Sequence, residues 1–405
     1  MNNILLITLS GLDRPGITAA VAGILARQRG NVLDIGQAVI HSTLSLGVLA
    51  ELDSRADRPA LLAELQAYAD DSGLKLRCEE VSPAAYGEWV DAQGRARYII
   101  TLLARKITAE QVAQVSAVFA DHGLGIDGIT RLSGRLPLGE LPPLSKACVE
   151  FSVRGPLRDA EAFRGELLEL AARLDADLAL QQDNMFRRHR RLVAFDMDST
   201  LIEAEVIDEL AREAGVGEQV AAITERAMRG ELDFKASFRA RVALLAGLPE
   251  SALAQVAVRL RITEGAEHLI STLRRLGYRT AILSGGFTYF ARRLQEQLGI
   301  DYVYANELEI AGGAVTGAVG GDIVDGRRKA ELLREIAERE GIDLQQVIAV
   351  GDGANDLPML SIAGLGVAFR AKPLVKQSAE QSISTLGLDA ILYLLGISDR
   401  YQQER

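Results

Sequence analysis

The pattern of hydrophobic and polar positions in the first 185 residues occurs twice in succession. Alternating apolar positions predict strands, and apolar positions three or four residues apart predict helices. The first copy predicts a strand (3–10), a helix (16–30), two strands (32–41 and 44–52), a helix (57–71) and a strand (74–81). The second copy predicts the same order at 97–104, 108–122, 126–132, 147–155, 159–174 and 176–183. We therefore expect two ferredoxin-like βαββαβ domains, over residues 1–85 and 86–185.

The pattern changes after the basic stretch at residues 187–191, where short apolar runs alternate with helix-like segments. Strands buried on both faces give such runs, so we expect an α/β domain over residues 186–405 with a parallel sheet. The predicted strands are RLVAF (191–195), YRTAIL (278–283), DYVYA (301–305), QQVIAV (345–350) and GLGVAF (364–369). Residues 205–262 predict a helical cap inserted after the first strand, and residues 308–319 predict a small hairpin.

The amino-acid composition limits the classes of partner that the protein can bind. The 55 acidic residues outnumber the 45 Lys and Arg residues, and the formal net charge of -10 disfavours nonspecific binding to nucleic acid or to an anionic membrane. The basic stretch at 187–191 is better explained as a solvated linker than as an RNA-binding segment. Two cysteines are too few for a disulfide framework, and no apolar run approaches the length of a membrane span. We expect a cytoplasmic protein with small ligands.

Polar turns follow three of the predicted strands in the α/β domain. Asp196 and Asp198 follow the first strand, Ser284 follows the second, and GDGAND (351–356) follows the fourth. Because ligands of open parallel sheets bind beyond the carboxyl ends of the strands, these turns should meet in one site. That site would collect the carboxylates of Asp196, Asp198, Asp352 and Asp356.

Several neighbouring carboxylates need a cation. Two of them about 4 Å apart repel by about 4 kcal/mol at an effective dielectric constant of about 20. Hard oxygen ligands with room for water and phosphate favour Mg²⁺ over zinc. A calcium-binding loop is the alternative, but its spacing fails, because position six from Asp196 is Leu201 and position twelve is Ile207, where such a loop needs Gly and Glu. We therefore expect Mg²⁺ as the cofactor.

The same turns contain the parts that phosphoryl transfer requires. Asp196, at a strand end, can act as a nucleophile. Asp198 faces the same way along an extended backbone and can protonate the leaving alcohol, then deprotonate a water. Ser284 and the backbone near Gly285 can bind phosphate oxygens, which Lys329 can neutralise. Each feature alone is usually a turn or a surface charge, but their joint occurrence favours a site.

Residues 191 to about 395 resemble the haloacid dehalogenase superfamily, through DMDST (196–200), SGG (284–286), Lys329 and GDGAND (351–356). Within the superfamily they are most similar to the phosphoserine phosphatase family. The resemblance implies a Rossmann-like parallel sheet (the haloacid dehalogenase fold) with a helical cap, and an aspartyl-phosphate intermediate.

The resemblance also implies roles for individual residues. Asp196 would be both nucleophile and metal ligand, and Asp198 would bind the metal through its backbone carbonyl. Asp352 would be the third protein ligand, while Asp356 would hold a metal-bound water. Asn355 would contact the phosphate or the substrate.

The cap sequence carries the resemblance that points to a substrate. By similarity, Glu205 would bind the ammonium group of phosphoserine and Arg241 its carboxylate, while Met228 and Phe234 would close the pocket. This agrees with physical chemistry, because Arg binds a carboxylate through two parallel hydrogen bonds. Without the surrounding site, Glu205 and Arg241 would be interpreted as helix-surface charges.

The two N-terminal repeats resemble ACT domains, which bind amino acids at interfaces. In GLDRPG (11–16), Asp13 and Gly16 match the turn at which Gly16 would let the backbone approach a ligand, and a plain strand-to-helix turn is the alternative. The second repeat lacks this turn, so packing in a dimer is an alternative role for it. The resemblance implies a homodimer and an amino acid effector such as serine.

Together these features predict a Mg²⁺-dependent hydrolase that releases L-serine and phosphate from O-phospho-L-serine. One alternative is a phosphotransferase that passes the phosphoryl group to another alcohol. The other alternative is a non-catalytic regulator that responds to amino acids. Asp196, Asp198, Lys329 and Asp352 together argue against the regulator, because a protein that only binds needs no nucleophile and no proton shuttle.

Overall fold

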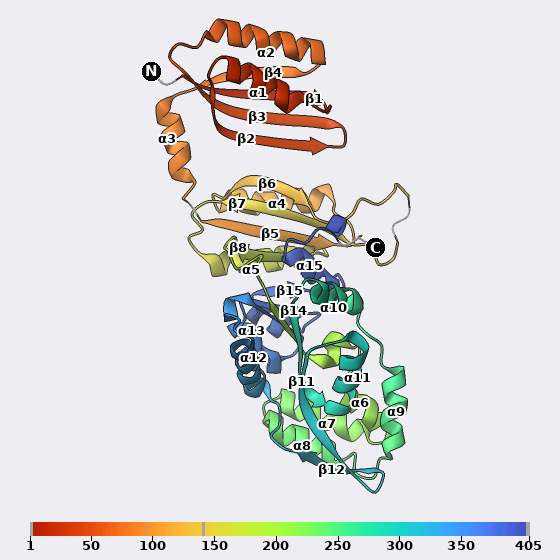
Figure 1. The fold of residues 1–405 in the computed structure, drawn as a ribbon. Helices are drawn as coiled ribbons and strands as arrows, with labels where there is room; N and C mark the ends of the chain where they lie inside the picture. The colour runs from red at the N-terminus through yellow and green to blue at the C-terminus, as the bar shows by residue number, and fades with distance from the viewer. Residues whose placement is uncertain (1–2, 95, 140–141, 402–405) are drawn as a thin grey trace. The chain divides into compact units, whose positions relative to one another are not determined.

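The computed structural model describes residues 3–94, 96–139 and 142–401. They form two compact units, one up to residue 95 and one from residue 96, which are described separately (Figure 1). Among the described residues, no helix combines the length and the apolar character that crossing a membrane requires.

The first unit has the predicted βαββαβ order. Its elements are β1 (Asn3–Leu12), α1 (Ile17–Arg27), β2 (Asn31–Ile40), β3 (Thr43–Leu52), α2 (Arg58–Ser72) and β4 (Lys75–Val81). The antiparallel sheet has the order β2-β3-β1-β4, the ferredoxin-like arrangement. Alternate residues of β1, including Leu5, Ile7 and Leu9, point into a core shared with both helices. The predicted fold of this unit is therefore confirmed.

Local signals set the helix boundaries in the first unit. Gly16 precedes α1 with φ of +98°, a left-handed conformation that favours glycine. Asp57 caps α2 by accepting a hydrogen bond from the Ala60 N–H at 3.0 Å. The hydrophobic pattern did not predict α3 (Pro83–Ala92), because none of its residues is buried. Its Ser-Pro start at Ser82 is nevertheless a recognisable helix beginning, since Ser82 caps the Ala85 N–H.

The second unit begins with another βαββαβ module, which we call the second module. Its elements are β5 (Arg97–Ala104), α4 (Ala109–Asp121), β6 (Gly125–Arg131), β7 (Ala147–Arg154), α5 (Ala160–Arg173) and β8 (Asp177–Gln182). The sheet order β6-β7-β5-β8 matches that of the first unit. The predicted repeat is confirmed.

The α/β domain follows. Its sheet contains β9 (Leu192–Phe195), β10 (Arg279–Phe287), β11 (Tyr302–Ala311), β12 (Ala314–Gly320), β13 (Val347–Gly351), β14 (Leu365–Phe369) and β15 (Gln381–Ile383). The order is β12-β11-β10-β9-β13-β14-β15, and only the β11–β12 hairpin pairs antiparallel. All five predicted strands and the hairpin are present. The strand β15 was not predicted, because it is only three residues long.

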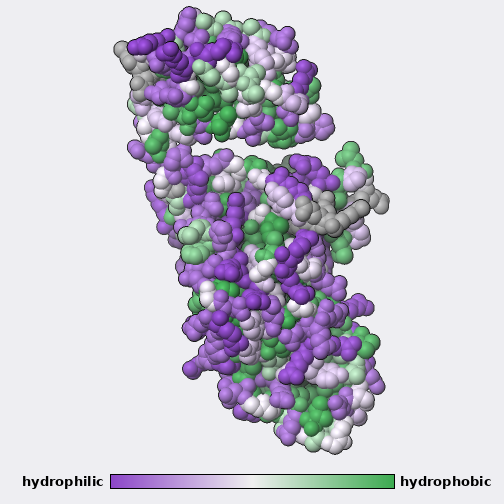
Figure 2. Space-filling model, in the orientation of Figure 1, coloured by the Kyte–Doolittle hydropathy of each residue, from purple (hydrophilic) through white to green (hydrophobic). Residues whose placement is uncertain are grey.

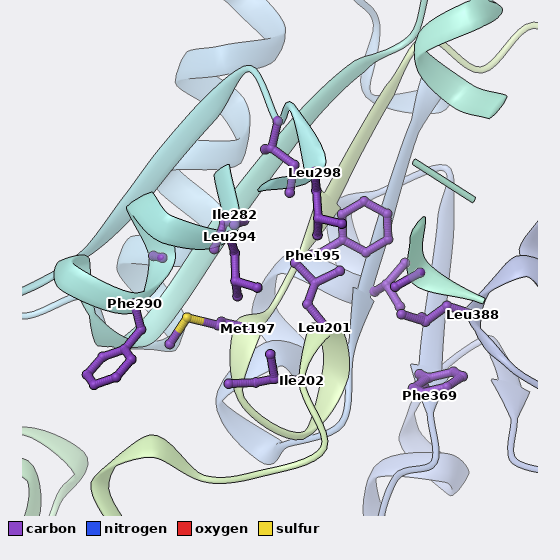
Figure 3. Close-up of a cluster of buried hydrophobic side chains, with 14 of the residues drawn as sticks. Phe195, Met197, Leu201, Ile202, Ile282, Phe290, Leu294, Leu298, Phe369 and Leu388 are labelled. Atoms are coloured by element: carbon purple, nitrogen blue, oxygen red, sulfur yellow. The ribbon is translucent and has the colours of Figure 1, made fainter. Parts of the chain in front are cut away.

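Helices cover both faces of this sheet. They are α10 (Ala266–Arg275), α11 (Thr288–Leu298), α12 (Gly326–Glu340), α13 (Leu357–Ile362), α14 (Pro373–Ser378) and α15 (Ile391–Leu394). Phe195 of β9 and Ile282 of β10 point to the face with Leu294 of α11 (Figure 3). Their neighbours Ala194 and Leu283 point to the opposite face, with α12 and α13. This alternation explains the continuous apolar runs, because both faces are buried.

The cap consists of helices, as predicted. They are α6 (Val206–Glu213), α7 (Gly217–Met228), α8 (Phe234–Ala243) and α9 (Glu250–Arg259). The chain leaves the domain after Leu201 and returns at Thr263, where the Thr263 N–H donates to the Leu201 carbonyl at 3.0 Å. A β-bridge between Ile202 and Ile262 joins the same two segments. The chain thus connects the cap to the domain through two adjacent segments joined by this bridge, and the cap also bonds to the β11–β12 hairpin, because the Gly247 N–H donates to the Val315 carbonyl at 2.8 Å.

The second module packs against the α/β domain within one core. Leu102 of β5 faces α4 and α5, whereas Leu103, Cys148 and Ala179 belong to the buried cluster that includes Tyr393. The side chain of Gln381 in β15 accepts from the Leu180 N–H of β8 at 2.9 Å and donates to the Leu180 carbonyl. The module is therefore fixed to the domain by both apolar packing and hydrogen bonds.

The basic stretch at 187–191 differs from the predicted solvated linker. Arg187 and Arg190 are buried, and Arg187 forms an ion pair with Glu150 of β7. Arg190 donates to the Gln345 carbonyl. Periodicity cannot show this, because the partners are distant in sequence. These arginines connect the second module to the first strand of the domain.

We predict that Glu150→Gln destabilises the second unit by about 3 kcal/mol, because it leaves the charge of Arg187 buried without a counter-charge. The double variant Glu150→Leu with Arg187→Met should lose much less, since it removes both charges. Urea unfolding followed by circular dichroism measures the difference, because the single tryptophan, Trp89, belongs to the first unit and does not report on the second. A single variant as stable as the parent chain would contradict the prediction.

Candidate active site

Asp196 lies at the carboxyl end of β9, the central strand of the sheet. Its N–H donates to the Val350 carbonyl of β13 at 2.8 Å, which continues the strand pairing by one residue. Its Oδ1 accepts from the Met197 N–H at 2.7 Å, so the backbone that follows orients the carboxylate. The side chain is only 7% exposed. β9 thus holds this acid rigidly at the sheet edge.

Lys329 joins two of the predicted acids. Its Nζ lies 2.8 Å from Asp196 Oδ1 and 2.7 Å from Asp356 Oδ1, and the side chain is fully buried. Lys329 lies in the first turn of α12, which Asp325 caps by accepting from the Arg328 N–H at 2.8 Å. Asp356 also accepts from the Gly353 N–H at 2.9 Å. The lysine therefore links the ends of β9 and β13.

Asp352 completes an acidic group. Oxygen atoms of Asp196, Asp352 and Asp356 all lie within 4.8 Å of one another. Thr200 is fully buried, and its hydroxyl lies 3.2 Å from Asp352 Oδ1. Thr200 belongs to the motif DMDST, from which no role for it was predicted. Its position indicates that it orients Asp352 by donating a hydrogen bond.

Asp198 lies in a tight turn directly after Asp196. Ser199 has a φ of +55°, so the chain reverses there. Asp198 Oδ1 accepts from the Val206 N–H, the first residue of α6, at 3.0 Å. Ser199 donates to Glu205 Oε1 at 2.8 Å. The turn therefore places Asp198 and Glu205 near each other, at the junction of the domain and the cap.

The loop at Ser284 approaches the acids closely. Ser284 is fully buried, and its Oγ accepts from the Gly286 N–H at 2.9 Å, which leaves the hydroxyl proton available. A Cβ atom at Gly286 would lie 2.3 Å from Asp198 Oδ2, so only glycine fits there. Asn306, which the sequence analysis missed, donates to the Gly285 carbonyl at 2.8 Å and accepts from the Val324 N–H at 2.8 Å.

Asn306 is 1% exposed and lies in β11, next to the loop. A polar residue directly after the apolar run DYVYA (301–305) was the signal available in the sequence. Its two hydrogen bonds satisfy backbone groups of two different loops, so it fixes the shape of the Ser284 loop.

The cap extends side chains of α8 toward this loop. A Cβ atom at Gly285 would lie 3.0 Å from Phe234 Cζ, so the Phe234 ring covers the loop. Arg241 lies two helical turns further along α8, and its buried Nε has no hydrogen-bond partner among the described residues. Burial lowers the pKa of Arg241, while Asp208, Glu205 and Asp198 act in the opposite direction. An unpaired buried guanidinium nitrogen needs an acceptor.

Met228 and Asn355 differ in burial, because Met228 is exposed and Asn355 is half-buried. Met228 is 67% exposed at the end of α7, with its sulfur 4.0 Å from Lys372 Nζ. Asn355 lies in the turn after β13, and the Asn355 carbonyl would lie 2.5 Å from a Cβ atom at Gly326. The predicted roles of both residues in substrate binding stay predictions.

The predicted regulatory residues belong to the first unit. Asp13 is exposed, and its N–H donates to the Ser42 carbonyl at 2.8 Å. Apart from Gly16 and its neighbours along the chain, no atom of the described residues lies within 4 Å of the position that a Cβ atom at Gly16 would take. The positive φ of Gly16 thus accounts for the glycine as a turn residue, and its predicted contact with a ligand stays a prediction.

Burial and negative neighbours raise the pKa values of the carboxyl groups. Burial, together with Asp356, raises the pKa of Asp196 well above its ordinary value. Burial and Glu205 raise the pKa of Asp198 to about 8. Burial and Asp356 raise the pKa of Asp352 to about 7. Asp198 can therefore carry a proton near neutral pH, which a general acid must do.

Lys329 stays charged in this setting. Burial lowers the pKa of its ammonium group, but the charges of Asp196 and Asp356 outweigh burial and raise that pKa above its ordinary value. One ammonium group nevertheless faces the carboxyl groups of Asp196, Asp198, Asp352 and Asp356, so negative charge is in excess. The donor atoms are all oxygen, as Mg²⁺ prefers. The residues present therefore fit a divalent cation.

Comparisons with known proteins agree with this geometry. The family model of haloacid dehalogenase-like hydrolases matches residues 193–361, and that of the ACT domain matches residues 3–79. A phosphoserine phosphatase of Streptomyces coelicolor is 44% identical over 97% of this chain and 92% of its own length. A phosphoserine phosphatase of Mycobacterium tuberculosis is 42% identical over 97% of this chain and 93% of its own length.

Solved structures show the same fold. A probable phosphoserine phosphatase of Vibrio cholerae in unliganded form has a TM-score of 0.60 at 36% identity, over 78% of this chain and 90% of its own. A haloacid dehalogenase family hydrolase of Salmonella enterica has a TM-score of 0.64 at 31% identity, over 74% and 98%. With relatives so similar over nearly the whole chain, the protein belongs to the phosphoserine phosphatase family of haloacid dehalogenase-like hydrolases.

Proposed function

We propose that this chain hydrolyses O-phospho-L-serine to L-serine and phosphate, with Asp196 as the nucleophile and Mg²⁺ as the cofactor. The observation that carries the proposal is that the same site combines two features. Lys329 holds Asp196 at the sheet edge, and Arg241 of the cap has a buried nitrogen for which the described residues offer no hydrogen-bond partner. The names of the full-length relatives support the same substrate.

In the first step, an oxygen of Asp196 attacks phosphorus as the bond from phosphorus to the serine oxygen breaks. Asp198 gives its proton to that serine oxygen, for which a pKa of about 8 suits it. In the second step Asp198 takes a proton from water, the water oxygen attacks phosphorus, and the aspartyl phosphate is cleaved. Asp196 is thereby restored, and phosphate is released.

Other residues of the chain hold the phosphoryl group. The Ser284 hydroxyl and backbone N–H groups near Gly285 donate to its oxygens, and the Lys329 ammonium offsets its charge. Asp196, Asp352 and the backbone carbonyl of Asp198 would hold Mg²⁺, and Asp356 would hold a water on it. When bound, the ion supplies positive charge that stabilises the phosphoryl oxygens.

The cap would recognise the amino acid part of the substrate. Arg241 would bind the carboxylate through two hydrogen bonds, and Glu205, at the start of α6, would bind the ammonium group. Met228 and Phe234 would enclose the substrate. The contact between Phe234 and Gly285 supports this, because it places the α8 face directly beside the phosphate loop.

We also propose a homodimer that binds an amino acid effector such as serine near Asp13 and Gly16. β2 is an edge strand whose Val32, Ile35, Val39 and Ile40 are 49%, 48%, 41% and 77% exposed. Figure 2 shows hydrophobic surface over the part of the first unit where β2 lies in Figure 1. An apolar edge strand supports pairing with another chain. Both cysteines are free, which supports a cytoplasmic setting.

We predict that Asp196→Asn abolishes phosphate release and the phosphoenzyme, because the amide is not a nucleophile. Incubation with ³²P-labelled phosphoserine, acid quenching and hydroxylamine treatment would detect the aspartyl phosphate in the parent chain. Asp121→Asn, at an exposed position of α4, serves as the control. Phosphate release at the parent rate by Asp196→Asn would refute the assignment.

Asp198→Asn should lower kcat by about 10² to 10⁴, because the leaving oxygen loses its proton donor. Phosphate release gives the rate, and calorimetric titration with Mg²⁺ should show that the ion still binds. The residual activity should be higher on aryl phosphates, whose leaving groups need less protonation. A variant with the parent rate on phosphoserine would argue against the role of Asp198.

Arg241→Ala should lower kcat/KM for phosphoserine by about 10²-fold, because a charged hydrogen-bonding partner of the substrate carboxylate is lost. The value for p-nitrophenyl phosphate, which has no carboxylate, should change much less. Arg239→Ala on the exposed side of α8 is the matched control. Equal losses on both substrates would exclude Arg241 as the carboxylate-binding residue.

A further inference from the structure

The covalent connection between the cap and the α/β domain consists of two short segments, residues 201–204 and 261–264, which we call the hinge. The Glu203 N–H donates to the Arg261 carbonyl at 2.9 Å, and the Thr263 N–H donates to the Leu201 carbonyl at 3.0 Å. Any rotation of the cap relative to the domain must change backbone angles in these segments, because the cap has no other covalent connection. A group that fixes the hinge therefore affects the position of the cap.

Arg105 of the second module reaches this hinge. It directly follows β5, and its Nη1 and Nη2 lie 2.7 and 2.8 Å from the two carboxylate oxygens of Glu264. This fork geometry is the strongest form of the Arg–carboxylate contact. The side chains are 29% and 17% exposed, so water screens the pair less than it screens a surface ion pair. The hydrogen bonds from Arg105 lower the pKa of Glu264.

The contact continues to the other hinge segment. Glu264 Oε2 also accepts from Arg370 Nη2 at 2.9 Å, and Arg370 Nη1 lies 3.8 Å from Glu203 Oε1. Arg370 follows β14 with a φ of +45°, an uncommon conformation for a residue other than glycine. The ion pairs thus connect the second module, both hinge segments and the end of β14.

A second ion pair of the second module supports the segment that directly follows the hinge. Lys146 of the second module forms an ion pair with Asp389. Gly265 follows Glu264, and a Cβ atom there would lie 2.4 Å from Asp389 Oδ1. The Glu264 carbonyl accepts from the Leu388 N–H at 2.8 Å. The backbone after the hinge is therefore packed against a segment that the second module also holds.

With the hinge in this geometry, the cap lies against the candidate active site. Lys235 of α8 lies 3.3 Å from Asp325, the residue that caps α12, and Phe234 covers Gly285. This position of α8 is also the one that brings Arg241 beside Asp198 and Glu205. A hinge held in this geometry therefore keeps the substrate-binding face of α8 over the phosphate loop.

We propose that Arg105 is a positioning residue, through which the second module holds the cap hinge in the geometry that binds phosphoserine. The inference rests on the proposed function for its substrate. It gives the second module a role in substrate affinity that needs no ligand of its own. The simpler interpretation, that Arg105 only stabilises the interface, makes a different prediction for two substrates.

The test compares Arg105→Ala, Arg105→Lys and the control Arg154→Ala in the full chain. Arg154 also forms an ion pair within the second module, at 2.7 Å from Asp127, away from the hinge. Arg105→Ala should raise KM for phosphoserine about tenfold, within the range of coupling between sites, and change kcat/KM for p-nitrophenyl phosphate less than about twofold. Arg105→Lys should recover part of the affinity, because it keeps the charge and loses the fork. The control should match the parent chain.

Amide hydrogen exchange of the peptides that contain residues 201–204 and 261–264 gives a second readout, which needs no substrate. Exchange should be faster in Arg105→Ala and unchanged in Arg154→Ala, with similar thermal unfolding midpoints. Equal losses on both substrates, or hinge exchange at the parent rate, would overturn the inference. If the parent chain released no phosphate from phosphoserine, the proposed function would fail, while hydrogen exchange would still test the hinge contact.

Discussion

The ammonium group of Lys329, buried between Asp196 and Asp356, is the interaction on which the site depends. Each carboxylate comes from the end of a different strand, and the lysine comes from a helix that begins beside them. Without the lysine, the repulsion between the acids would be uncompensated in a setting with little water, and removing one partner of such a buried group typically costs about 3 to 5 kcal/mol. The two ion pairs of Lys329 therefore also require that β9 and β13 lie next to each other in the sheet.

The remaining excess of negative charge supports the proposed chemistry. Burial and mutual repulsion make it costly to ionise all of the acids at once, and the pKa of Asp198 rises to about 8 as a result. The same excess that makes a divalent cation fit also allows one carboxyl group to act as an acid. One electrostatic arrangement thus accounts for both the proposed cofactor and the proposed proton donor, in a site closed by a loop that tolerates only glycine at position 286.

Most of the α/β fold and the group of acids could be predicted from the sequence, because apolar runs mark strands and polar turns mark strand ends. Contacts between distant segments could not. Arg187 and Arg190 looked like a solvated stretch, and only their partners Glu150 and Gln345 show that they are buried. The Arg105–Glu264 pair has no local signature either, and the place of Asn306 after an apolar run does not show which two loops it joins. The helix α3 was missed for the opposite reason, since an exposed helix leaves no apolar stripe.

The side chain of Gln381 has a consequence for how sheets can assemble. By bonding to both backbone groups of Leu180, it acts as a one-residue substitute for a neighbouring strand along β8. Sheet growth at that border is blocked by the protein itself. The opposite border, β6, is exposed at each of its seven residues. Within the described part of the chain, the four-stranded sheet of the second module can therefore gain a strand at one edge only, and the added strand must pair with β6.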